Sequence, residues 1–184
     1  MSFVYDGQDQ PIVPSRGVRV EAALQRVFKG VEPDPGPLAD GETARRTIGK
    51  ISVSDFRPIH KRHLVMLAFS GGSSFGASAD SYYDFTLGGP ERLRAFQLGE
   101  FRGPNYLLGT AAYLHNLGRL PDFMGGQIYL SGVFETGCTF SELGSARLLT
   151  VVSSGLVIDT LLGPVSLSAG LSLDGHFRFY ANVG

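Results

Sequence analysis

The serine inside a short glycine-rich run is a residue whose type and surroundings could support covalent chemistry. Residues 72–76, Gly-Ser-Ser-Phe-Gly, fit the Gly-x-Ser-x-Gly pattern, in which Ser74 would attack an ester carbonyl. Asp159 and His176 follow it in the chain order Ser, Asp, His that such hydrolases use. The pattern requires a helix after the serine, and residues 77–83 have no helical period. We therefore keep a serine hydrolase as the least favoured hypothesis and expect no catalytic residue.

The histidines are a second group that could do chemistry, as ligands of a metal ion. None of the four has a ligand partner at helical spacing, and His60 and His63 lie on either side of the basic pair Lys61-Arg62. A solvated turn at a membrane surface explains that arrangement better than a zinc site. Cys138 is the single cysteine, so neither a disulfide nor a cysteine cluster can form within the chain. We predict no metal site and no cofactor.

The composition favours short strands over helices. The chain has 184 residues, of which 25 are glycine, 11% are aromatic and only 18% are charged. Soluble domains usually carry about 25% charged residues. The net charge of −1 lacks the basic field that a nucleic-acid partner requires. We expect no nucleic-acid partner.

Alternation of apolar and polar residues identifies the strands that must position these side chains. Apolar residues take every second position of 165–173, and serine or glycine fills the positions between them. A period of two indicates a strand whose two faces meet different environments. The same alternation covers 18–25, 127–135 and 176–181, and less regular runs lie at 45–56, 63–72, 106–114 and 147–158.

Short turns alternate with long loops between these strands. Compact breakers lie at 14–17, 57–62, 120–122, 162–164 and 174–175, and longer polar loops at 32–42, 80–103 and 137–145. This arrangement is typical of an outer-membrane barrel. No run of 18 apolar residues is present, so the sequence predicts no membrane-spanning helix. Alternation alone fits a soluble β-sandwich or small barrel equally well, with its apolar face as the core.

The loop at 80–103 carries the residues that favour the membrane alternative. Residues 87–96 read Leu-Gly-Gly-Pro-Glu-Arg-Leu-Arg-Ala-Phe. They resemble the loop that folds into the lumen in the BamA/TamA superfamily of outer-membrane barrels (the bacterial surface antigen family), where a Gly-Gly pair precedes a Val-Arg-Gly-Phe tip. The match lies at Gly88, Gly89, Leu93, Arg94, Ala95 and Phe96, with alanine at the family's tip glycine.

Three further segments resemble the same family in the same order. They are Gly-Val-Phe-Glu-Thr-Gly at 132–137, Asp-Thr-Leu-Leu-Gly-Pro-Val at 159–165 and Gly-His-Phe-Arg-Phe at 175–179. The family's last strand usually ends on an aromatic residue, whereas this chain ends Asn-Val-Gly. The resemblance implies an all-β, antiparallel, up-and-down transmembrane barrel of about eight strands, equivalent to the C-terminal half of a sixteen-stranded barrel. About three strands and a stub at 2–6 precede the loop, and five follow it.

The nearest resemblance is to the barrel of patatin-like outer-membrane proteins. It implies that residues 1–184 form one outer-membrane barrel domain, with no signal peptide, POTRA or patatin domain. The implied function is a membrane anchor or translocator for a patatin-like phospholipase or a related assembly or secretion system. The implied partners are membrane lipids and a patatin-like domain on a fuller chain. The alternative is a soluble β-barrel or sandwich that binds a small apolar ligand.

Within this resemblance, Arg94 lies on a loop held inside a lumen. A buried, unpaired charge is costly, so Arg94 needs a carboxylate there. The alternation in 127–135 turns Glu135 to the inner face. We therefore predict an Arg94–Glu135 pair, with bidentate geometry available to the guanidinium.

Half a barrel would leave two unpaired strand edges, which lipid does not tolerate. Three solutions stay open: closure as an eight-stranded barrel, pairing of two copies as a homodimer, or a partner half-barrel from another polypeptide.

Overall fold

The computed structural model describes residues 1–9, 14–28, 45–75, 85–121, 125–160 and 163–183, and these residues form an all-β fold. Nine strands form one antiparallel sheet in the order β1-β2-β3-β4-β7-β8-β9-β10-β11, and β5 and β6 form a separate pair. The strands are β1 (Ser2–Asp6), β2 (Gly17–Phe28), β3 (Arg45–His60), β4 (His63–Phe75), β5 (Phe85–Leu87), β6 (Phe101–Gly103), β7 (Asn105–Arg119), β8 (Gly125–Phe140), β9 (Leu149–Thr160), β10 (Gly163–Ser172) and β11 (Phe177–Val183), with a 3-10 turn, η2 (Leu143–Ser145), after β8.

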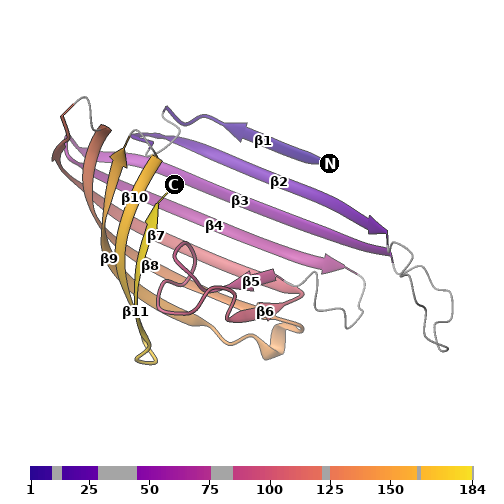
Figure 1. The fold of residues 1–184 in the computed structure, drawn as a ribbon. Coiled ribbons are helices and arrows are strands. Elements are labelled where there is room, and N and C mark those ends of the chain that lie inside the picture. Colours follow the sequence, from indigo (N-terminus) through magenta and orange to yellow (C-terminus); the bar gives the residue numbers. More distant parts are fainter. Residues whose placement is uncertain (10–13, 29–44, 76–84, 122–124, 161–162, 184) are drawn as a thin grey trace.

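The sheet is an open, curved trough (Figure 1). The strands follow chain order across it, and β9, β10 and β11 curl round so that the segment containing β5 and β6 lies on the concave side. The expected up-and-down antiparallel order is confirmed. The expected closure is not found, because β1 and β11 are the two ends of the sheet and do not pair with each other. The described residues contain no helix with the length and hydropathy needed to cross a bilayer.

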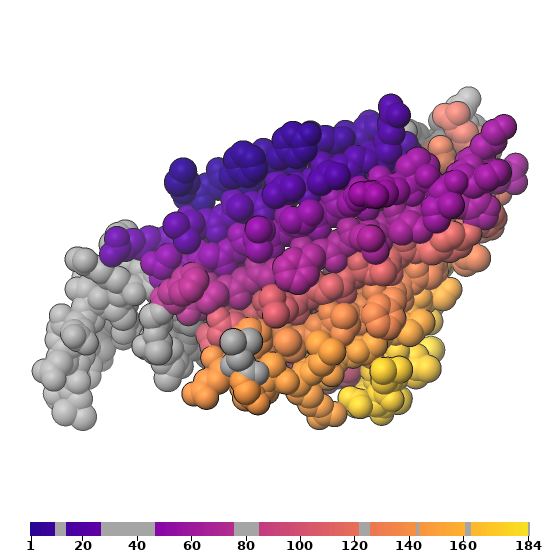
Figure 2. Space-filling view, turned by 180° about the vertical axis from the view of Figure 1, so that it is seen from behind, coloured from indigo at the N-terminus to yellow at the C-terminus, as the bar shows by residue number. Residues whose placement is uncertain are grey.

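Strand pairing gives the sheet two chemically different faces. The convex face, shown in Figure 2 with the strands in order from indigo to yellow, exposes at least one large apolar side chain from every strand. They include Phe3, Leu24, Ile51, Phe69, Leu107, Phe134, Val152, Leu167 and Phe179. The intervening residues face the concave side and include Glu21, Lys50, Ser70, Glu135, Ser153, Ser168 and Arg178.

The strands are longer than the sequence alternation indicated. β8 continues to Phe140, so the loop predicted from Gly137 onward is wrong in its first four residues. Gly137 pairs with Leu108 and Leu149, and a Cβ on it would lie 2.7 Å from the Leu107 carbonyl oxygen. This glycine permits close strand approach instead of ending the strand.

The turn predicted at 57–62 is also shorter than expected. β3 runs to His60 and β4 starts at His63, which leaves Lys61 and Arg62 as the turn. Pro58 lies beside an irregularity in the β3–β4 register, a position where a strand accepts proline. We call this end of the sheet, where β3 meets β4 and β9 meets β10, the short-turn end, and the opposite end the long-loop end. The predicted loop at 32–42 lies outside the described residues.

Candidate functional site

The segment from β5 to β6, residues 85–103, folds back on itself inside the trough. Gly88 and Gly89 adopt φ of 105° and 120°, a region that favours glycine. The Gly88 carbonyl accepts a hydrogen bond from the Gly99 N–H at 3.3 Å, which closes the segment into a compact loop. Among the described residues other than glycine, only Leu93 has a positive φ, of 55°. Ala95 therefore does not adopt the left-handed region. We call residues 85–103 the inserted loop.

Apolar contacts hold the inserted loop against the sheet. Phe85 packs on Tyr106 of β7 with ring centroids 4.9 Å apart, above Gly72 of β4. A Cβ on Gly72 would lie 2.7 Å from both rings, so this glycine makes room for them. Leu87 and Leu93 have no exposed surface and form the centre of the core. The larger of two buried clusters therefore lies between the loop and the concave face, and the smaller one, which includes Leu64, Leu114 and Tyr129, lies on the concave face toward the short-turn end.

The structure brings Arg94 and Glu135 together at the tip of the inserted loop. Arg94 Nη1 lies 3.1 Å from Glu135 Oε1, and the Arg94 backbone N–H donates to Oε2 at 3.0 Å. Among the described residues, the Glu135 carboxylate is therefore bound by one guanidinium nitrogen and the backbone N–H of Arg94. The predicted bidentate contact would have used two guanidinium nitrogens. Glu135 is 0% exposed and Arg94 22% exposed. An ionised carboxylate without a partner at this position would be strongly destabilising.

The last two strands clamp the same tip from the other side. A Cβ on Gly170 of β10 would lie 2.6 Å from the Arg94 carbonyl, so the loop backbone rests directly on this glycine. The Tyr180 hydroxyl of β11 donates a hydrogen bond to the Phe96 carbonyl. The Phe96 ring packs against Phe101 at 4.9 Å and His176 at 5.3 Å. Sequence alternation places Gly170 and Tyr180 on the inner face but does not predict these contacts.

A cavity of about 330 Å³ lies beside the tip, under the inserted loop. Its wall combines Arg94 and Glu91 of the loop with small polar residues of the concave face, such as Ser153, Ser166, Ser168 and Asn182. The buried Ser153 Oγ and Arg178 Nε have no hydrogen-bond partner among the described residues. The sheet side of the cavity is mixed, because apolar residues such as Met66, Leu114 and Val133 line it together with the serines, and its loop side carries charge.

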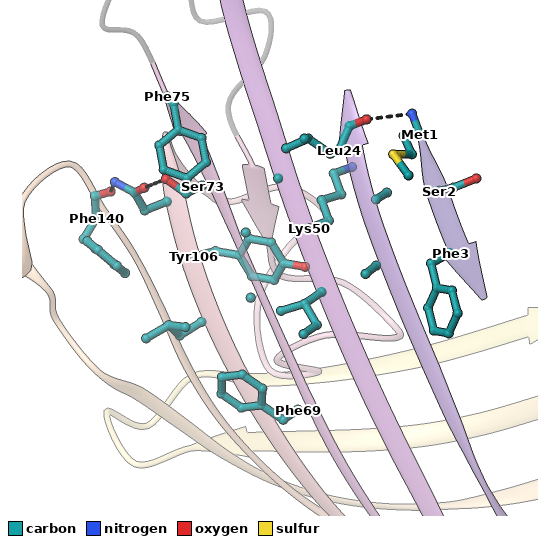
Figure 3. A pocket seen from close by; sticks show the side chains of 18 residues that line it. Met1, Ser2, Phe3, Leu24, Lys50, Phe69, Ser73, Phe75, Tyr106 and Phe140 are labelled. Atoms are coloured by element: carbon teal, nitrogen blue, oxygen red, sulfur yellow. Dashed lines mark hydrogen bonds between the residues drawn. The ribbon is translucent and has the colours of Figure 1, made fainter. Parts of the chain in front are cut away.

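A second hollow, of about 620 Å³, lies on the convex face across β1, β2, β3, β4 and β7. Figure 3 shows Phe69 and Phe75 of β4 at two ends of it, with Leu24 and Phe3 on the β1–β2 side. Its floor includes Gly49 and Gly71, where the backbone carries no side chain. Ser73 donates to Asn105 at 2.6 Å at its long-loop end. The lining is otherwise mainly apolar.

The residues of the serine hydrolase pattern do not assemble into a triad. Ser74 lies on β4 at the long-loop end, where its N–H donates to the Pro104 carbonyl at 2.8 Å. Asp159 lies at the short-turn end of β9, paired with Pro164. His176 lies in the turn between β10 and β11, where its N–H donates to Ser172 Oγ at 2.9 Å. Strand pairing therefore holds Ser74 and Asp159 at opposite ends of the sheet.

The structure brings together three histidines that the sequence leaves scattered. His60, His63 and His115 lie side by side at the short-turn end, with ring centroids 5.9 Å apart for the first two and 4.6 Å for the last two. Cross-strand register creates this cluster, because His63 and His115 are direct partners on β4 and β7. In the described part of the chain, no group of three or more His, Cys, Asp or Glu side chains is arranged to hold a metal ion.

No protein-family model matches the chain, and no curated protein matches it either.

Proposed function

We propose that the chain is a membrane-embedded β-sheet module of an outer-membrane barrel, with the convex face toward lipid and the concave face toward a lumen. The observation that carries this proposal is the convex face, which exposes large apolar side chains on all nine strands of the sheet. Soluble monomers rarely expose contiguous apolar patches larger than a few hundred Å². A lipid-facing surface of alternating strands has this character.

The distribution of charge supports the same orientation. Asp55 and Arg57 are charged residues of the convex face; they contact each other at 2.7 Å and lie toward the short-turn end, and Arg26 lies on the same face near the long-loop end of β2. The inner face instead carries the Arg94–Glu135 pair and an inserted loop. An ion pair inside the trough and large exposed apolar side chains outside it fit a lumen-facing and a lipid-facing surface.

The hollow of Figure 3 also fits a lipid-facing surface. Its glycine floor and its walls of Phe69, Phe75 and Leu107 offer apolar surface without hydrogen-bonding demand. Acyl chains can fill such a surface, whereas water would leave it exposed at a cost of roughly 25 cal/mol per Å².

The proposed role is that of a membrane anchor or translocator. It rests on the resemblance of the inserted loop and three later segments to the BamA/TamA superfamily, nearest to patatin-like outer-membrane proteins. The chemistry of a phospholipase would then belong to a patatin-like domain on a fuller chain. This chain would form the part that is embedded in the membrane. A closed barrel would require the edges β1 and β11 to meet each other or edges of a partner.

The test is refolding with and without detergent. The chain would be refolded from inclusion bodies into detergent and into liposomes, and examined by circular dichroism and by gel mobility with and without boiling. We expect a strand-rich spectrum and an unboiled band whose mobility differs from that of the boiled chain, and both should require detergent or lipid. A monodisperse, folded protein in buffer alone would contradict the proposal and favour the alternative, a soluble β-module that binds a small apolar ligand.

A second experiment tests the location. The chain would be expressed behind a signal peptide, and the cell membranes separated. The heat-modifiable band is expected in the outer-membrane fraction, resistant to extraction by alkaline carbonate. Recovery in the soluble periplasm would contradict the proposed anchor.

A further inference from the structure

Two histidines face each other across strands β4 and β7 at the short-turn end. His63 is the first residue of β4, and its register partner is His115 of β7. The two rings are 4.6 Å apart between centroids and both side chains are half-buried. Tyr113, two residues before His115, stacks on His63 with centroids 5.8 Å apart. All three side chains lie on the convex face.

The donor atoms of these side chains converge. Nδ1 of His63 lies 3.3 Å from Nδ1 of His115, and the Tyr113 hydroxyl makes a hydrogen bond with the same Nδ1 of His63. Two nitrogens bound to one tetrahedral metal ion at about 2.0–2.1 Å lie about 3.3 Å from each other. The pair therefore already has the spacing of two ligands of one ion. Neutral imidazole is also a preferred ligand of zinc, copper and nickel.

We infer that His63 and His115 form a binding site for a divalent transition-metal ion such as Zn²⁺, with the Tyr113 oxygen as a third donor. Binding would break the hydrogen bond between Tyr113 and His63: each histidine would bind the ion through an unprotonated Nδ1, with its proton on Nε2, and Tyr113 would bind as the phenolate after releasing its proton to solvent. A cavity of about 220 Å³ at the same end of the sheet is lined by His60 and His63, and its other residues, such as Leu64 and Tyr129, belong to the concave face.

Charge sets a limit on the affinity. Lys61 and Arg62 form the adjoining turn, and their positive charge opposes a bound cation. Arg57 opposes it less, because Asp55 pairs with its guanidinium at 2.7 Å. With two or three protein ligands in a basic environment, we expect binding far weaker than that of a closed, four-ligand structural zinc site.

The consequence would be a clamp between two particular strands. β4 and β7 are the strands that flank the inserted loop, and His63 and His115 join them at the end away from that loop. An ion that binds only the folded pair stabilises the fold by mass action. The inference needs only the β4–β7 pairing and does not rest on the membrane assignment.

The experiment is a Zn²⁺ titration of the whole chain, refolded without a histidine tag, by isothermal calorimetry. We expect one ion per chain, and a loss of affinity on the order of tenfold or more in His63→Ala and in His115→Ala. Tyr113→Phe should weaken binding less, because both nitrogens remain. His176→Ala, at the long-loop end, is the matched control and should bind as the wild type does.

A second readout separates binding from folding. Zn²⁺ should raise the temperature at which the wild-type fold is lost, and this rise should be absent in His63→Gln and His115→Gln, which keep polar side chains of similar reach. The absence of saturable binding in the wild type would overturn the inference. Equal affinity or an equal temperature rise in folded His63 and His115 variants would overturn it as well.

Discussion

Glu135 is a carboxylate with no exposed surface, and both of its oxygens contact one residue of the inserted loop. The two partners therefore differ in how much each needs the other to remain charged. Arg94 keeps 22% of its side chain exposed and can reach water if the pair is broken, whereas Glu135 cannot. Glu135 therefore depends on the loop more than the loop depends on Glu135.

This difference predicts that the two single variants lose different amounts of the free energy of unfolding. Arg94→Ala leaves a buried carboxylate without its cation and should cost about 3–5 kcal/mol, the usual loss for half of a buried ion pair. Glu135→Gln should cost less, because a neutral amide can still accept the Arg94 N–H. Urea unfolding in detergent measures both losses, and protease cleavage within the inserted loop reports its release.

The double variant Arg94→Ala/Glu135→Ala provides the control. It should lose less than the sum of the two single alanine variants, since no buried charge is left alone. Strict additivity, or unchanged protease sensitivity of Arg94→Ala, would contradict a pair that holds the loop.

Gly170 supplies a second residue-scale prediction. Gly170→Ala places a Cβ 2.6 Å from the Arg94 carbonyl, and two backbones cannot yield as a flexible side chain would. We expect a loss of about 1–3 kcal/mol and faster cleavage of the inserted loop. Gly132→Ala is the matched control in β8, because a Cβ there meets nothing within 4 Å. Equal stability of the two variants would show that β10 does not support the loop.

Asp9, in the connection between β1 and β2, gives a pH prediction. The Ser15 hydroxyl and the backbone N–H groups of Ser15 and Arg16 donate to its carboxylate, and they lower the pKa of Asp9. A lowered folded pKa means that this support is complete above the ordinary Asp pKa of about 3.9 and is lost as pH falls through the folded pKa. Amide exchange at Ser15 and Arg16 should therefore show an extra acid-side rise that Asp9→Asn lacks.

The inward side of Glu135 was predictable from the alternation in β8, whereas the placement of Arg94 beside it was expected only from the resemblance of the inserted loop to a lumen loop. Contacts that depend on register were not predictable. The Tyr180–Phe96 hydrogen bond joins residues 84 positions apart, and His63 and His115 are 52 apart. If a strand shifted by two residues against its neighbour, every residue would still point to the same face, but its cross-strand partners would change. Alternation alone could therefore not reveal such contacts.

At the scale of strands, the alternation in the sequence predicted which residues share a face. The runs at 18–25 and 127–135 lie within the observed strands, and the run at 165–173 extends one residue, Leu173, beyond the end of β10. The strand ends were less predictable, because glycine and proline mark turns in some contexts and tolerated irregularities in others. Gly137 and Pro58 both lie within strands, where they are tolerated and do not mark turns.

The two faces of β4 allow a direct test of orientation. Phe69 and Ser70 are neighbours that point to opposite faces, with Phe69 49% exposed on the convex side. In liposomes, Phe69→Lys should cost about 2–4 kcal/mol, as for a lysine facing lipid near the bilayer midplane. Ser70→Lys, facing the trough, should cost much less. Urea unfolding in liposomes measures both, and improved solubility of Phe69→Lys without detergent would instead favour a soluble protein.

For the whole molecule, the open sheet is the feature that most constrains assembly. Both β1 and β11 have one side without a strand neighbour in the described chain. Unpaired backbone groups are not tolerated in lipid, so both edges need partners there. We expect a detergent-refolded particle of more than one 19.7 kDa chain by light scattering, with slow hydrogen exchange at the outer amides of β1 and β11. A single-chain particle with equally protected edges would indicate closure of one copy.

The inserted loop also separates two stages in the folding of the chain. Each strand of the sheet pairs with its neighbours in chain order, so hairpins can form one after another at small cost in chain entropy. The supports of the loop, Glu135, Gly170 and Tyr180, all follow it in the sequence. The loop can settle only after β8, β10 and β11 have joined the sheet. Pulse-labelled hydrogen exchange should accordingly find the Arg94 amide protected later than the amides shared by β7 and β8.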